Sequence, residues 1–190
     1  MSLGLARYLE VDFALTWMMR CLDSDEQSRL TFITRVQGLA GISAGLLGAS
    51  EVVLTDLPYS LPWCNESIAL NSGALAQEQS SVRAEALDCF APPAVDLNRW
   101  SVVLAADVVW LVELVLPFVR TLEVLAPPGS STSIIFSYQR RGADADTELW
   151  SRLKEAQFNV EGPLTFEPFG TDGEKDGSGI DLGIYILKRP

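Results

Sequence analysis

The chain has 190 residues, 48% of them apolar, which is enough for one globular domain with a sizeable core and too few for two ordinary domains. Its 25 acidic and 14 basic residues give a formal net charge of −11, which disfavours nucleic-acid binding and is compatible with a basic protein partner. The sequence has no histidine, so the commonest general base and the commonest metal ligand are excluded.

The first half of the chain is predicted to alternate between helices and strands. An amphipathic helix is expected at 11–22, followed by a polar break at 22–29. Further elements follow in order: a β-branched strand at 30–36, a helix rich in small residues at 38–49, a strand at 51–55, a helix at 59–76 and a strand at 81–88.

The second half continues the alternation. The predicted elements are a strand at 101–106, a helix at 111–125, a strand at 131–138, an amphipathic helix at 147–158 and a closing strand pair at 159–167 and 180–188 around a polar loop. Such alternation indicates an α/β fold with a mostly parallel sheet and helices on both faces. No linker interrupts it, so the prediction is a single domain over 1–190, in which residues 1–29 form an N-terminal helical extension.

Two features bear on where the protein acts. The apolar stretch 101–119 contains Asp107, Glu113 and Pro117, and each acid would cost about 2.5–3.5 kcal/mol near a bilayer centre. A buried strand, a break at Asp107 and then a helix is the preferred interpretation. Three widely spaced cysteines without a CxxC pair indicate reduced thiols, and the expected location is the cytoplasm or also the nucleus.

Three carboxylates follow predicted strands. Asp56 comes directly after the strand at 51–55 and about 18 residues after Gly38, where an acid in a nucleotide-binding α/β fold accepts hydrogen bonds from ribose hydroxyls. Asp88 and Asp107 end two further strands. Each can instead cap a helix or stand as a solvated loop acid. Together at one sheet edge they would repel one another unless a ligand with hydrogen-bond donors bound there.

Several stretches carry a resemblance to a known family. They are "GLAGISAGLLGASEVVLTDLP" (38–58), "LPWCNESIALN" (61–71), "WSVVLAADVVW" (100–110), "IIFSYQRR" (134–141), "ELWSRLKEAQFNV" (148–160) and "TWMMRCL" (16–22). In this order they resemble the seven-strand, S-adenosylmethionine-dependent methyltransferases, in particular the methyltransferase-like protein lysine methyltransferases of family 16. The resemblance implies a Rossmann-like class I methyltransferase fold with a seven-stranded, mostly parallel sheet, and S-adenosylmethionine as the cofactor.

The resemblance also implies roles for single residues. Asp107 would orient the target nitrogen, Trp110 would provide an aromatic wall, and Tyr138 would line the acceptor channel. The implied cofactor contacts are Gly38, Asp56, Leu57, Asp88, Ala105 and Trp17, and no metal is implied. The expected enzyme is a monomer that methylates a lysine of a cytosolic protein, either one with a basic surface or a chaperone or translation factor, with no nucleic-acid or membrane partner.

The first loop departs from the family pattern E-x-G-x-G-x-G. Aligned through Gly38, the chain has Phe32 in place of the acid, and Thr34 and Val36 in place of the first two glycines. Val36 would crowd the methionine part of the cofactor, which a glycine admits. The cofactor would then be held differently, weakly or not at all, and an error in the gene model over 25–37 would give the same pattern. The rival functions are a noncatalytic protein-binding module and a small-molecule methyltransferase.

Overall fold

The computed structural model describes residues 29–34, 38–91, 100–140, 142–164 and 182–190. The predicted helix at 11–22 lies outside these residues, as do Trp17, Cys21 and Val36. Cys64 and Cys89 form no disulfide among the described residues, and the reduced state of the cysteines stays a prediction.

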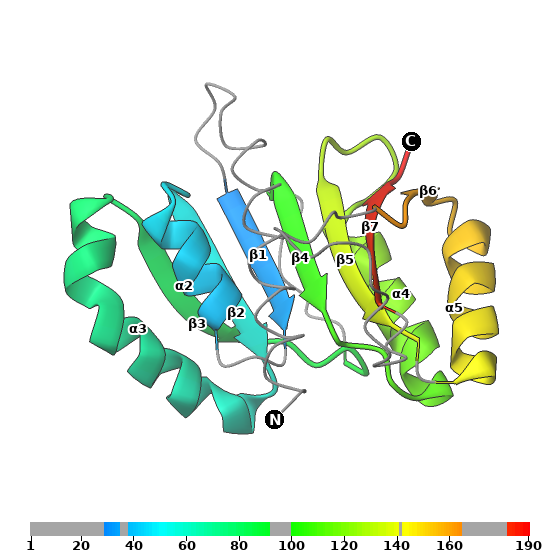
Figure 1. Cartoon of the computed structure of the whole chain (residues 1–190), viewed down its shortest axis with the longest axis horizontal. Coiled ribbons are helices and arrows are strands. Elements are labelled where there is room, and N and C mark those ends of the chain that lie inside the picture. Colours follow the sequence, from blue (N-terminus) through cyan, green and yellow to red (C-terminus); the bar gives the residue numbers. More distant parts are fainter. Residues whose placement is uncertain (1–28, 35–37, 92–99, 141, 165–181) are drawn as a thin grey trace, which may run out of the picture.

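One sheet dominates the described residues (Figure 1). Its seven strands run in the order β3-β2-β1-β4-β5-β7-β6. The first five are parallel, and β7 is antiparallel to both of its neighbours. The strands are β1 (Arg29–Thr34), β2 (Glu51–Asp56), β3 (Ser81–Ala86), β4 (Val102–Ala106), β5 (Ser133–Gln139), β6 (Asn159–Glu161) and β7 (Leu182–Lys188). The predicted α/β class and the predicted pairing of the two closing strands are therefore confirmed.

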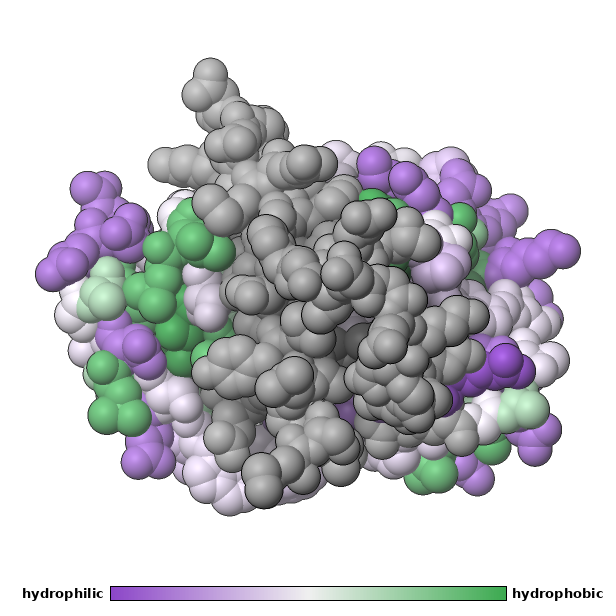
Figure 2. Space-filling model, viewed as in Figure 1, coloured by the Kyte–Doolittle hydropathy of each residue, from purple (hydrophilic) through white to green (hydrophobic). Residues whose placement is uncertain are grey.

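Helices cover both faces of this sheet. They are α2 (Leu39–Leu46), α3 (Leu61–Gln77, preceded by the short helix η1, Pro58–Ser60), α4 (Val112–Leu125) and α5 (Ala143–Glu155). Buried residues of α2 and α3 pack against one face, whereas those of α4 and α5 pack against the other. Figure 2 shows apolar colour gathered over α2. This two-sided cover explains why the central strands read as continuous apolar runs rather than as alternating ones.

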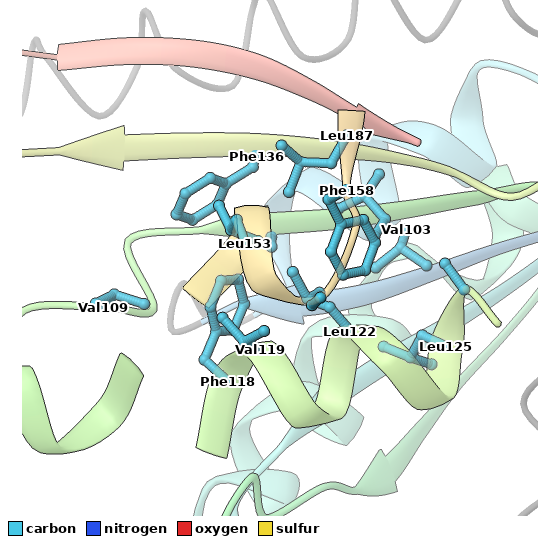
Figure 3. Packing of buried hydrophobic residues seen from close by; sticks show 14 of the residues in the cluster. Val103, Val109, Phe118, Val119, Leu122, Leu125, Phe136, Leu153, Phe158 and Leu187 are labelled. Atoms are coloured by element: carbon cyan, nitrogen blue, oxygen red, sulfur yellow. The ribbon is translucent and has the colours of Figure 1, made fainter. Parts of the chain in front are cut away.

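The larger core lies between α4, α5 and the second half of the sheet. Figure 3 shows Phe118 and Leu122 of α4 facing Phe136 of β5, Leu153 of α5 and Leu187 of β7. All five side chains are almost completely buried, and the rings of Phe118 and Phe136 lie 5.2 Å apart. Each such side chain contributes about 1.5–3 kcal/mol through burial. This packing holds the carboxyl ends of β4 and β5 in place.

The apolar stretch 101–119 divides as predicted. It forms β4, a turn from Asp107 to Leu111, and the beginning of α4. Val115, Phe118 and Val119 face the core from α4. No helix in the part of the chain that the structure describes is long and apolar enough to span a bilayer.

Candidate active site

The topology brings the three predicted acids to one edge of the sheet. Asp56 is the last residue of β2, Asp107 follows the end of β4 directly, and Asp88 lies two residues beyond β3. The carboxyl ends of these parallel strands point toward the lower edge of the sheet in Figure 1. Since β1 lies between β2 and β4, the strand order reverses between Asp56 and Asp107. Ligands of open α/β sheets bind at such a reversal.

Asp56 is held by the backbone that follows it. Its Oδ1 accepts a hydrogen bond of 2.7 Å from the N–H of Leu57, a half-buried residue, and its carbonyl oxygen accepts one of 2.9 Å from Leu87. Neither η1 nor α3 has a side-chain cap, so Asp56 does not cap the next helix. Its Oδ2 accepts no hydrogen bond from the described residues, and this oxygen is suited to a ligand hydroxyl.

Asp88 organises a tight turn beyond β3. Its Oδ1 accepts a hydrogen bond of 2.9 Å from the N–H of Phe90, and its carbonyl oxygen accepts one of 3.0 Å from Ala91. Burial raises the pKa of the neighbouring Cys89 thiol, and the Asp88 charge acts in the same direction. The carboxylate is therefore positioned by its own turn, at the same edge as Asp56.

Asp107 occupies an uncommon backbone conformation. Its φ is +51°, in the left-handed region that few residues other than glycine adopt, and that conformation costs about 1–2 kcal/mol. Its N–H donates to the carbonyl oxygen of Ser137 at 3.3 Å, which continues the β4–β5 pairing by one residue. The turn then buries Val109 and leaves Trp110 half-buried. Gln79 and Gln157 share this conformation just after α3 and α5, so it does not by itself mark a functional site.

Gly38 and Ala105 lie close to the same edge. Gly38 precedes α2 with a φ of +78°, and a Cβ on it would come 2.5 Å from Leu54 Cδ1, so the position requires glycine. Ala105 is buried in β4, where its register partners are Ile33 of β1 and Phe136 of β5. Their contact with the cofactor stays a prediction.

The substituted first loop begins inside a regular strand. Phe32 and Thr34, which stand in place of the family's acid and first glycine, belong to β1. In the parallel register Phe32 pairs with Leu54, and Thr34 pairs with Ala106. The backbone at these two positions therefore follows the sheet.

Tyr138 directly follows Ser137, the β5 residue whose carbonyl oxygen accepts a hydrogen bond from the N–H of Asp107. It is 4% exposed near the end of β5, stacks on Phe136 with ring centres 5.5 Å apart and meets Trp150 edge-on at 5.7 Å. It lines a cavity of about 180 Å³ together with Arg140, Asp146, Trp150, Gly183 and Tyr185. Burial, and secondarily the Asp146 charge, raises the pKa of the Tyr138 phenol. Its role in an acceptor channel stays a prediction.

The acid of this cavity was not anticipated from the sequence. The Oδ1 of Asp146 accepts a hydrogen bond of 2.9 Å from Trp150 Nε1, and its Oδ2 lies 3.3 Å from Arg140 Nε. Asp146 and Trp150 are four residues apart on α5, so they share one helix face. The predicted start of that helix, at 147, leaves Asp146 outside it and hides this spacing.

A comparison with known families identifies the group to which this fold and site belong. The sequence profile of a lysine methyltransferase family matches residues 34–156, which is more than half of the chain. The chain belongs to this family. The match confirms the resemblance, the class I methyltransferase fold and S-adenosylmethionine as the cofactor. A search of curated proteins finds no match.

Solved structures share the fold at low sequence identity. The S-adenosylmethionine-dependent methyltransferase SibL, in its apo form, is 17% identical with a TM-score of 0.60, over 97% of this chain and 57% of SibL. TYW2 of P. horikoshii, in complex with MeSAdo, is 16% identical with a TM-score of 0.53, over 90% of this chain and 59% of TYW2. The methyltransferase domain of bacterial CtHen1-C is 11% identical with a TM-score of 0.62, over 93% of this chain and 96% of that domain. This chain thus spans little more than half of SibL and TYW2.

The described residues fit the nucleoside part of this cofactor. Asp56 offers a carboxylate oxygen with no hydrogen bond from the described chain, and a ribose provides hydroxyl donors for it. The residues expected to hold the methionine part differ from the family pattern at Phe32, Thr34 and Val36. In the described part of the chain, no group of three or more Cys, Asp or Glu side chains gathers to hold a metal ion.

Proposed function

We propose that this protein is an S-adenosylmethionine-dependent N-methyltransferase that acts on a lysine side chain of a cytosolic protein. The observation that carries the proposal is Asp107, an acid in a left-handed turn beside the strand-order reversal. Trp110 follows three residues later in the same turn. The family match supports the reaction class.

In methyl transfer from a sulfonium to an amine, the main task of the protein is to position the two reacting groups. Bound S-adenosylmethionine supplies a methyl group on a sulfonium, and the acceptor must reach it as a neutral amine. The protein's tasks are to align that amine and to exclude water. In the proposal Asp107 accepts a hydrogen bond from the lysine nitrogen, and Trp110 presents an aromatic face to an ammonium or methylammonium group. Asp56 accepts hydrogen bonds from the ribose, and Asp88 accepts one from the adenine amine.

Asp107→Ala tests the catalytic role. Glu78→Ala is the matched control, because Glu78 is an exposed acid that directly follows α3 and lies before the amino end of β3, away from Asp107. Radiolabelled methyl transfer to proteins of a cell lysate is measured beside calorimetric titration with S-adenosylhomocysteine. Asp107→Ala should abolish transfer with nearly unchanged affinity, since its task is orientation rather than anchoring of the nucleoside. Equal labelling by wild type and Asp107→Ala would refute the role.

A noncatalytic protein-binding module is the second candidate. The observation that favours it is the loss of the acid and of two glycines from the first loop, at Phe32, Thr34 and Val36. A folded wild-type protein that transfers no label to any fraction of the lysate would support this candidate. Label that enters only the low-mass fraction would instead indicate a small-molecule methyltransferase.

A further inference from the structure

The first two turns of α4 present apolar side chains to solvent. Leu111 is 53% exposed, Val112 42% and Leu116 38%, and these three residues are called the α4 patch. Val112 and Leu116 are four residues apart and therefore lie on one helix face, at the flank of the side that packs into the core. Further along the outer face the helix becomes polar at Arg120. Exposed apolar residues gathered at one place mark an interaction surface.

The α4 patch adjoins the turn that carries the proposed acceptor residues. Leu111 follows Trp110 directly and lies four residues after Asp107. The helix begins at the carboxyl edge of β4, the lower edge of the sheet in Figure 1. A polypeptide that places one side chain at Asp107 can therefore lay a neighbouring side chain on the α4 patch.

The described residues around the carboxyl ends of β2, β3 and β4 are acidic. The described stretches 38–47, 56–77, 87–91 and 107–119 contain no lysine or arginine. Their charged residues are the acids Asp56, Glu66, Asp88, Asp107 and Glu113. At the opposite edge two bases form ion pairs: Arg29, which opens β1, with Glu51, and Arg189, which follows β7, with Glu123. Of the described bases, Arg140 follows the carboxyl end of β5, where it forms an ion pair with Asp146.

We propose that the α4 patch is a docking surface for the protein substrate, where it binds an apolar side chain in a basic segment that carries the target lysine. This inference rests on the proposed function. A basic segment complements the acids of the carboxyl edge, whereas a second copy of this chain has a formal net charge of −11 and would be repelled by them. The apolar side chain supplies affinity, and the basic residues supply orientation and speed of association.

Short fluorescein-labelled peptides with one central lysine test the proposal by fluorescence anisotropy. The first peptide has arginine flanks and one leucine near the lysine, the second replaces the leucine by serine, and the third replaces the arginines by glutamates. The protein variants are Val112→Thr/Leu116→Gln and the control Val124→Thr. Val124 is an exposed apolar residue of the same helix, 37% exposed and two turns further from the carboxyl edge.

The first peptide should bind the wild type and Val124→Thr equally. Its affinity should fall about tenfold in Val112→Thr/Leu116→Gln, as expected when an apolar side chain loses its burial. The serine peptide should bind the wild type about tenfold more weakly than the first peptide and should be insensitive to the double substitution. The glutamate peptide should not bind measurably.

Three outcomes would overturn the docking surface: equal binding of the first peptide by both variants, equal binding of the arginine and glutamate peptides, or no binding of any peptide by folded protein. Two further measurements, methyl transfer to the first peptide and titration with S-adenosylhomocysteine, distinguish a failure of the docking surface from a failure of the proposed function. Patch-dependent binding without methyl transfer refutes the proposed function and leaves the docking surface standing. Equal methyl transfer to the first peptide by Val112→Thr/Leu116→Gln and by Val124→Thr refutes the docking surface and leaves the proposed function standing.

Discussion

Replacing Gly38 by alanine should destabilise the fold through two separable effects. The first is conformational, because the φ of +78° at this residue belongs to the left-handed region and costs an L-residue about 1–2 kcal/mol. The second is steric, because the new Cβ would lie 2.5 Å from Leu54 Cδ1. Leu54 is only 2% exposed, so it cannot move away without repacking, and such overpacking costs about 1–3 kcal/mol. The expected total loss is about 2–5 kcal/mol.

Gly129→Ala separates the two effects. Gly129 has a φ of +76°, nearly that of Gly38, and its added Cβ would meet no atom within 4 Å. This control should therefore lose only the conformational share, about 1–2 kcal/mol. The additional loss in Gly38→Ala, about 1–3 kcal/mol, measures the contact with Leu54.

Urea unfolding followed by circular dichroism gives both values. With an m-value of about 2 kcal/mol/M, the extra loss in Gly38→Ala lowers the unfolding midpoint by about 0.5–1.5 M relative to Gly129→Ala. Leu54→Val shortens the obstructing side chain and should reduce the cost of the Gly38 substitution in the double variant. Equal midpoints for the two glycine variants would refute the assignment of the clash to Leu54.

Three further predictions concern the site. Asp56→Ala should weaken S-adenosylhomocysteine binding at least about tenfold in calorimetry, because a hydrogen bond to a charged group contributes about 1.5–3 kcal/mol; unchanged affinity would remove Asp56 from the site. Val36→Gly, alone or with Phe32→Glu, should strengthen that binding, and folded variants that bind no better would show that the alignment through Gly38 is wrong. Burial, and then the Asp56 charge, raises the pKa of the Cys64 thiol above 9.0. The protonated thiol therefore stabilises the fold below pH 9.0, and this stabilisation is lost as the pH rises through the pKa that the thiol has in the folded protein. The difference in unfolding free energy between wild type and Cys64→Ala should therefore narrow above pH 9.0, and a constant difference would contradict the burial argument.

Local sequence patterns predict most of the sheet because its strands are short, apolar and bounded by turns. The predicted strand at 101–106 becomes β4 over Val102–Ala106, and the one at 131–138 becomes β5 over Ser133–Gln139. The predicted helix at 147–158 is displaced, since α5 begins at Ala143 and ends at Glu155. Its first turn contains Asp144 and Asp146, acids that favour a helix N-terminus but carry no apolar periodicity.

Some features of the candidate site follow from local sequence, whereas others depend on residues that are far apart in the chain. The placement of Asp56, Asp88 and Asp107 at one edge follows from strand ends alone once the strands are known to be parallel. The cavity beside Tyr138 depends on the pairing of Tyr138 with Gly183, residues that are far apart in the sequence. The left-handed turn at Asp107 accompanies a hydrogen bond from its N–H to Ser137 of β5, a partner that no local pattern contains.

The position of β7 has a consequence for how the chain folds during synthesis. This strand lies between β5 and β6, although its residues emerge from the ribosome about 40 residues after β5 is complete. At about 5–20 residues per second, the edge of β5 therefore stays unpaired for roughly 2–8 s. Ile134, Ile135 and Phe136 on that strand are all buried in the finished protein, and an apolar, open strand edge is a template for aggregation. The nascent chain should accordingly depend on chaperones until residues 182–188 have been made.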